Sequence, residues 1–226
     1  MKRCLALICC LLMGFSLSFA VERISFFDSY QEPMLVLSSR TDSSFKPHSS
    51  SEFELLINEQ YADIYEASYE DKRWVIEPDF YFMLSGVIIE VEPAEAAIRL
   101  QMQVKSQVSI QNEGPHLDLL EWKSQLSDLE VIPLDRQNRA VLPDIVVDQS
   151  AFPEFSKAEL RAAVFGAGGQ HWVKVLDYYD SLKLDYGEWI SPVMILPSEV
   201  YIKVERWSDG QWIEVEELVF ILPMGC

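Results

Sequence analysis

The alternation of apolar and polar residues is clearest near the end of the chain, in residues 200–222. Two runs rich in β-branched and aromatic residues flank Asp209-Gly210, a dipeptide that supplies the positive φ angles of a two-residue hairpin turn. Because side chains alternate between the faces of a strand, one face of this hairpin is mainly apolar and the other charged. The pattern therefore predicts an antiparallel hairpin with one buried face.

A turn at Asp209-Gly210 also predicts which residues lie opposite each other. The expected pairs are Trp207 with Trp212, Glu205 with Glu214, Val204 with Val215 and Ile202 with Glu217. The two tryptophans fall on the face away from the core, whereas Glu217 falls on the apolar face. An unpaired carboxylate there would be costly, so we expect a β-bulge near Glu216-Glu217 that reverses the facing beyond it.

Other strand-like patterns occur in the first half of the chain. Residues 21–30 and 34–37 read as short strands. Residues 79–92 and 97–110 alternate strongly and are joined by a short connection that contains a proline, which predicts a second hairpin. Residues 53–69 carry an aromatic or large apolar residue every fourth position, a spacing that fits either a strand or a helix.

Helix signals are fewer. Ser156 and Glu159 have the spacing of a capping box, which predicts a helix through residues 160–165 that ends at the glycine-rich residues 166–169. Residues 117–129 form a weaker helix candidate, and residues 172–176 and 182–186 alternate like strands. The sequence thus predicts a mainly β, α+β fold of antiparallel sheets with one or two short helices, and a β-sandwich is one arrangement that fits.

The first 20 residues have the composition of a secretory signal peptide. Lys2 and Arg3 precede an apolar run at residues 4–15, and Ser18 and Ala20 give the small-residue pattern of a cleavage site. The apolar run is shorter than the roughly 20 residues that span a bilayer. We therefore expect residues 1–20 to be removed and residues 21–226 to form a single β-rich domain in the periplasm or outside the cell, without a membrane span.

Charge and cysteine content narrow the range of partners. The chain carries 18 basic and 36 acidic residues, a net charge of −18, and removal of residues 1–20 would make this −20 because two basic residues are lost. Such acidity opposes nucleic-acid binding and suits a basic protein partner, although it also serves solubility alone. Cys226 is the single cysteine after residue 20, so we expect no internal disulfide. Whether Cys226 forms a disulfide between two chains is left open by the sequence.

Motifs for cofactor and metal binding are weak. The glycines at residues 166–169 follow the predicted helix, whereas a phosphate-binding loop would precede one. His48, His116 and His171 are scattered, without the spacing of metal ligands. We therefore expect neither a cofactor nor a metal.

A group of carboxylates is the one candidate for catalysis. Asp177, Asp180, Asp185 and Glu188 are interleaved with aromatic residues, as in an acid pair that hydrolyses a glycosidic bond or in a calcium site. Their spacing lacks the alternating ligands and central glycine of a calcium loop. With 36 acidic residues in the chain, such groups also arise without function. We favour an exported, acidic, non-enzymatic interaction protein, either an inhibitor or immunity protein or a component of an envelope assembly. The alternative is a hydrolase of carbohydrate or cell wall that uses Asp/Glu pairs.

Aromatic residues near the predicted strands are the candidate binding residues. They are Trp207, Trp212, Trp189 and Tyr186. Exposed aromatic side chains often anchor a partner protein. A cross-strand pair such as Trp207 and Trp212 also stabilises a hairpin by about 0.2–1 kcal/mol without any ligand.

The signal peptide gives the first testable prediction. The exported protein should begin at Val21, and N-terminal sequencing of the protein recovered outside the cytoplasm will check this. Recovery of a chain with an intact Met1 in the membrane fraction would contradict cleavage.

Overall fold

The structure of the chain is a computed structural model. It describes Val21 and residues 23–28, 30–31, 33–38, 54–57, 64–78, 84–92, 97–112, 114–181 and 192–224. These residues form a mainly β structure with one α-helix, which confirms the predicted fold class. The predicted signal segment at residues 1–20 and the strand-like residues 182–186 lie outside the described residues.

The smaller of two sheets has five antiparallel strands in the order β11-β6-β1-β2-β3. Their bounds are β1 Arg23–Phe27, β2 Pro33–Ser38, β3 Glu54–Ile57, β6 Ile88–Glu92 and β11 Arg139–Val141. The short strands predicted at residues 21–30 and 34–37 are confirmed as β1 and β2.

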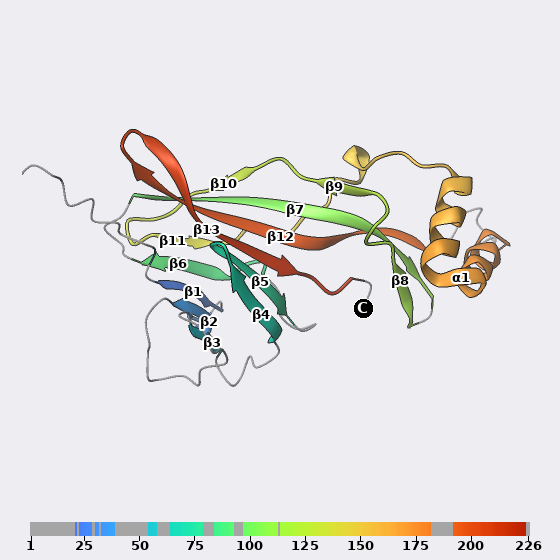
Figure 1. Cartoon of the computed structure of the whole chain (residues 1–226), viewed down its shortest axis with the longest axis horizontal. Coiled ribbons are helices and arrows are strands. Elements are labelled where there is room, and N and C mark those ends of the chain that lie inside the picture. The colour runs from blue at the N-terminus through green and yellow to red at the C-terminus, as the bar shows by residue number, and fades with distance from the viewer. Residues whose placement is uncertain are drawn as a thin grey trace, which may run out of the picture.

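The larger sheet has the order β10-β7-β12-β13-β5-β4, with β8 and β9 also paired to β7 (Figure 1). Its bounds are β4 Ile64–Glu70, β5 Arg73–Pro78, β7 Ile98–Gln111, β8 His116–Asp118, β9 Ser124–Leu126, β10 Glu130–Ile132, β12 Val193–Ser208 and β13 Gln211–Ile221. All pairs are antiparallel except β13 with β5, which is parallel. Where the structure describes the ambiguous residues 53–69, they form strands, β3 and the start of β4.

The two sheets stack on a shared core, so the sandwich arrangement is confirmed for this part of the molecule. Phe26 of β1 meets Phe220 of β13 edge to face, with ring centroids 5.5 Å apart. Aromatic pairs in this geometry add about 0.5–1.5 kcal/mol beyond the area they bury. The core also contains Ile24, Leu35, Ile76, Ile89, Leu100, Val200, Ile202 and Leu218.

A second core lies where β7 and β12 extend beyond the sandwich to α1 (Lys157–Ser181), at the opposite end of the molecule from β1–β3 (Figure 1). Here Val108 and Ile110 of β7 pack with Leu160, Val164 and Leu176 of the helix. The two long strands therefore contribute side chains to both cores.

The capping box predicted at the start of α1 is confirmed. The Ser156 N–H donates to Glu159 Oε2 at 2.7 Å, and the Glu159 N–H donates to Ser156 Oγ at 3.2 Å. The hydrogen bond from the Ser156 N–H lowers the pKa of the Glu159 carboxyl, and together the two bonds satisfy two backbone donors at the helix start. A short 3₁₀ turn, η2 (Gln149–Ala151), precedes the helix.

Gly169 breaks α1 into two segments. Its φ of 70° and ψ of −165° are not helical, and glycine adopts a positive φ without strain. Arg161 pairs with Asp177, and Lys157 Nζ lies 3.0 Å from Asp180 Oδ1. Residues 16 apart would be separated by about 24 Å along a straight helix, so the chain turns back at the break.

The strand predicted at residues 172–176 is therefore wrong, because this segment belongs to the second half of α1. Five alternating residues do not distinguish a strand from a helix segment. Val173, Val175 and Leu176 are buried in the second core. Packing on the sheet and on the first half of α1 thus decides the conformation.

The hairpin predicted between residues 79–92 and 97–110 is also wrong. β6 belongs to the smaller sheet, where it pairs with β1 and β11, and β7 belongs to the larger sheet. β7 pairs instead with β12 along almost its whole length, from Ile98–Arg206 to Ile110–Val193. Alternation indicates which face of a strand is buried but not which strand lies beside it.

The helix suggested for residues 117–129 is not formed. This segment contains β8 and β9, which pair with one edge of β7. Leu119 is buried whereas its neighbour Leu120 is exposed, so the leucines do not share a face. Hydrogen bonding to the open edge of a long strand outweighs a weak helical pattern.

The β12–β13 hairpin has the predicted turn. Its bulge lies one residue closer to that turn than the predicted position at Glu216-Glu217. Trp207 lies opposite Trp212 and Glu205 opposite Glu214, as predicted. The register then shifts at Val215, which has no partner on β12. Beyond it, Val204 lies opposite Glu216 and not Val215 as predicted, and Ile202 lies opposite Leu218 and not Glu217. The carboxylate turned toward the core is therefore that of Glu216, and Glu217 lies on the outer face.

Glu216 is half-buried and weakly solvated. Tyr69 donates a long hydrogen bond of 3.4 Å to its Oε1, while its buried Oε2 has no hydrogen-bond partner among the described residues. Burial raises the pKa of Glu216 to about 7, although the Tyr69 hydrogen bond and the charge of Lys72 oppose the change. Glu217 instead lies 2.6 Å from Arg73 Nε on the outer face.

These facts give a prediction for Glu216→Gln. The folded protein favours the protonated carboxyl, so the contribution of Glu216 to stability should fall as pH rises from about 4.5 to about 7 and then level off. At pH 8 the variant should therefore unfold with a free energy about 1–2 kcal/mol higher than wild type, after allowance for partial solvent screening. At pH 4 the two proteins should be nearly equal.

Urea unfolding at pH 4 and pH 8 measures both differences. Glu217→Gln is the matched control, because it removes an ion pair and should slightly lower stability at pH 8. A Glu216→Gln protein that is less stable than wild type at pH 8 would contradict the account.

Candidate functional site

The turn of the β12–β13 hairpin presents two tryptophans at the end of the larger sheet. Asp209 and Gly210 have φ angles of 50° and 84°, which match the two positive angles of a type I′ turn. The rings of Trp207 and Trp212 meet at a centroid distance of 5.3 Å and an interplanar angle of 69°. In Figure 1 this hairpin projects from the body of the molecule.

The tryptophans differ in exposure. Trp207 is 48% exposed, and Trp212 is more protected. The Trp207 N–H donates to the carbonyl of Ala97, which ties the end of β12 to the start of β7. The half-exposed indole is therefore displayed from a backbone that is held on both sides.

Arg99 of β7 fixes Trp212. Its guanidinium lies 4.7 Å from the centroid of the Trp212 ring, a cation–π distance. The same guanidinium donates to Glu205 Oε2 at 2.6 Å. We call Arg99, Glu205, Trp207, Trp212 and Glu214 the tryptophan tip.

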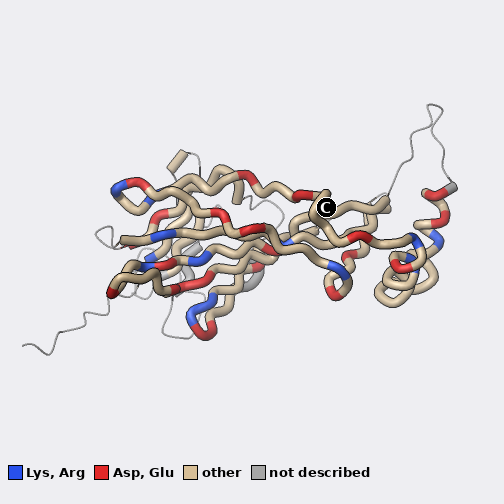
Figure 2. The backbone as a smooth tube through the Cα atoms, turned by 90° about the horizontal axis from the view of Figure 1, so that it is seen from above, with Lys and Arg blue, Asp and Glu red and all other residues tan. Residues whose placement is uncertain are grey.

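Ion pairs continue from the tip along the outer face of the larger sheet. Lys203 lies 2.9 Å from Glu214, and Lys105 lies 2.5 Å from Glu199. Figure 2 shows basic and acidic positions interspersed along the long strands. Cross-strand pairs of this kind each contribute about 0–1 kcal/mol when exposed, and they keep this face charged.

Of the four candidate binding residues, the structure describes Trp207 and Trp212, which form the tip. Trp189 and Tyr186 lie outside the described residues, as do Asp185 and Glu188. Asp177 and Asp180 are engaged in the ion pairs that join the two halves of α1. Among the residues that the structure describes, no group of three or more His, Cys, Asp or Glu is placed to hold a metal ion.

A hollow at the other end of the molecule was not predicted from the sequence. It has a volume of about 750 Å³ and lies between α1 and the start of β12. We call it the distal pocket, lined by Gln149, Phe155, Lys157, Leu160, Arg161, Leu176, Tyr179, Asp180 and residues 192–196. The apolar run at residues 193–196 is the one sequence feature that could have drawn attention to it.

Two comparisons of the sequence with known proteins found no match. No protein-family model matches the chain, and no curated protein matches it in sequence. In the described part of the chain, no helix has the length and apolar character needed to cross a membrane. Since no matching sequence indicates a function, function is inferred from two surfaces of the structure, the tryptophan tip and the distal pocket.

The geometry of the tip predicts unequal effects of truncating the two indoles. Trp212→Ala removes both the ring pair and the Arg99 contact, so it should lower the free energy of unfolding by about 1–2 kcal/mol. Trp207→Ala removes only the ring pair and should cost about 0.5–1 kcal/mol. Urea unfolding of the two variants checks the order, with Trp212→Phe as a milder control. Equal losses, or a larger loss for Trp207→Ala, would contradict this role of Arg99.

Proposed function

We propose that this chain is an exported, acidic interaction protein that binds a basic protein partner through the tryptophan tip. The observation that carries the proposal is the half-exposed Trp207 indole, displayed beside Trp212 on the charged outer face. Tryptophan is one of the residue types that most often dominate binding energy at protein interfaces.

An indole face suits a cationic side chain. A Lys or Arg placed over the ring of a tryptophan is attracted by its quadrupole, and Arg fits best because its guanidinium is planar and weakly hydrated. Arg99 already makes this contact with Trp212 inside the molecule. We propose that a partner Arg or Lys stacks on the exposed part of Trp207 in the same way.

The surrounding charge supports a basic partner. Glu214 is half-exposed, and its ion pair with Lys203 is weak enough to exchange for a partner cation. Over longer distances, the net charge of −20 that remains after removal of residues 1–20 accelerates the approach of a basic protein and repels acidic ones. Charge thus favours encounter, and the indole provides the local anchor.

The biological setting follows from the N-terminal segment. The signal-like residues 1–20 support a partner in the periplasm or outside the cell, where an inhibitor or immunity protein or a component of an envelope assembly would act. A hydrolytic function gains no support from Asp177 and Asp180, because both carboxylates are used in ion pairs.

The test has two stages. The first compares decaarginine with decaglutamate peptides by following tryptophan fluorescence during titration. Decaarginine should bind and decaglutamate should not, and Trp207→Ala should weaken decaarginine binding. The second isolates a partner from envelope extracts and measures its affinity for wild type and variants.

For that partner, Trp207→Ala should weaken binding by about 2 kcal/mol, close to thirtyfold, as expected of an interface anchor. Val146→Ala is the matched control, because Val146 is an exposed apolar residue outside the tip. Binding should also weaken as the salt concentration rises. Unchanged affinity of the Trp207→Ala protein, or an acidic partner, would refute the proposal.

A further inference from the structure

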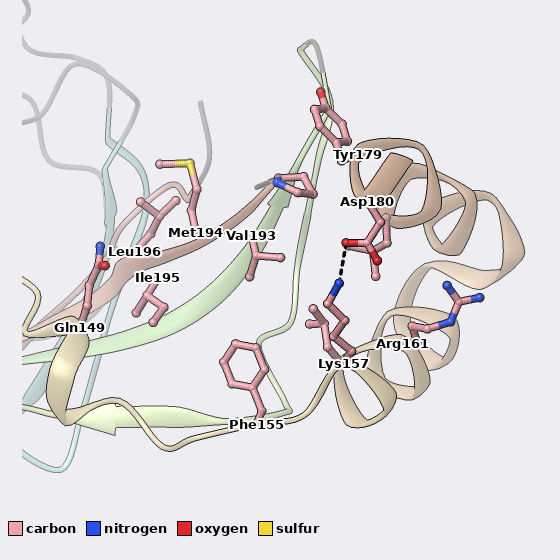
Figure 3. Close-up of a pocket in the computed structure, with 13 residues that line it drawn as sticks. Gln149, Phe155, Lys157, Arg161, Tyr179, Asp180, Val193, Met194, Ile195 and Leu196 are labelled. Atoms are coloured by element: carbon pink, nitrogen blue, oxygen red, sulfur yellow. Dashed lines mark hydrogen bonds and ion pairs between the residues drawn. The ribbon is translucent and has the colours of Figure 1, made fainter. Parts of the chain in front are cut away.

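The distal pocket has walls of different character (Figure 3). Its apolar lining residues include Phe155, Leu160 and Leu176, together with Val193 and Ile195 of β12. Lys157, Arg161 and Asp180 of α1 also line the hollow, and the Lys157 side chain is 82% exposed. The pocket thus combines an apolar interior with a charged, solvent-accessible side.

The hollow arises from unequal strand lengths. β13 ends at Ile221, which lies opposite Glu199, so among the described strands residues 194–197 of β12 pair only with β7. The two halves of α1 pack on the sheet here without filling the space. Protein interiors are close-packed, whereas binding sites for small molecules have volumes of about 300–1,000 Å³. At about 750 Å³ the pocket is in that range.

The residues that line the pocket include more basic than acidic side chains, whereas the whole chain is acidic. The pocket lining includes two cations, Lys157 and Arg161, and one carboxylate, Asp180, whereas the whole chain has twice as many acidic as basic residues. Both cations already pair with helix carboxylates, Lys157 with Asp180 and Arg161 with Asp177. These pairs are exposed and therefore weak, so a bound anion can replace a carboxylate as partner.

We infer that the distal pocket binds a single-chain anionic amphiphile, a molecule with a hydrocarbon chain and a carboxylate, sulfate or phosphate head. The hydrocarbon lies against Phe155, Leu160 and Ile195, and the head group pairs with Lys157 and Arg161. This inference does not depend on the proposed role of the tryptophan tip, since it concerns the opposite end of the molecule (Figure 1).

Calorimetric titration of the full chain with laurate, below its micelle concentration, tests the inference. Laurate should bind at least fivefold more tightly than dodecyl maltoside, which has the same chain length and no charge, and dodecyltrimethylammonium should bind most weakly. From octanoate to laurate, each added CH₂ should tighten binding by up to about fourfold, the effect of full burial.

Matched variants locate the bound molecule. Lys157→Glu should weaken laurate binding at least fivefold, whereas Lys174→Glu should not, because Lys174 is an exposed residue of the same helix that does not line the pocket. Ile195→Phe narrows the apolar interior and should weaken laurate and dodecyl maltoside alike, with its melting temperature measured as a check on folding. Trp207→Ala should leave laurate binding unchanged.

Three outcomes would overturn the inference. They are an absence of laurate binding, equal effects of Lys157→Glu and Lys174→Glu, and tighter binding of the cationic amphiphile than of laurate. A second titration with vesicles of anionic phospholipid distinguishes two sources of the ligand, a free amphiphile and a membrane surface. A chain that binds such vesicles but not monomeric laurate gives the first of these outcomes, and its ligand is then a membrane surface.

Discussion

The antiparallel pairing of β7 with β12 is the constraint on which the rest of the structure depends. It runs from Ile98 opposite Arg206 to Ile110 opposite Val193. At one end its apolar face covers the sandwich core through Leu100 and Ile202, and at the other it covers the helical core through Val108 and Ile110. A slip of one residue would turn these side chains to the opposite face, so each core fixes the register of the end that it covers. Between the two ends the register shifts by one residue, at Pro197 to Glu199 of β12.

The bulge at Val215 reconciles two requirements of β13. Trp212 must face outward to meet Trp207, while Leu218 and Phe220 must face inward to fill the core. Strict alternation would place all three even-numbered residues on one face, and one unpaired residue between them resolves the conflict. The same bulge turns Glu216 toward the core, and burial there raises its pKa to about 7.

The two surfaces from which we infer function lie at opposite ends of the long strand pair (Figure 1). The tip is where β12 turns into β13, and Arg99 near the start of β7 holds Trp212 in place. The pocket lies where the start of β12 extends beyond the end of β13 and the two halves of α1 pack against β12. Unequal strand lengths in a single sheet thus create a projecting aromatic hairpin and a partly open apolar hollow.

The sequence by itself determined the features that depend on near neighbours. Asp209-Gly210 predicted the turn and the outward tryptophan pair, and Ser156 with Glu159 predicted the start of the helix. Turn angles and helix caps involve residues only a few positions apart, so local chemistry is enough to specify them.

Tertiary structure decided which segments became neighbours. Alternation marked β6 and β7 as strands, but their placement in different sheets depends on β1 and β12, which are distant in sequence. The return of α1 after Gly169 depends on burial of Val173 and Leu176 against β7, and the distal pocket exists only because that helix meets β12. Such contacts depend on competition among partners for the same edges and faces, which periodicity along one segment does not encode.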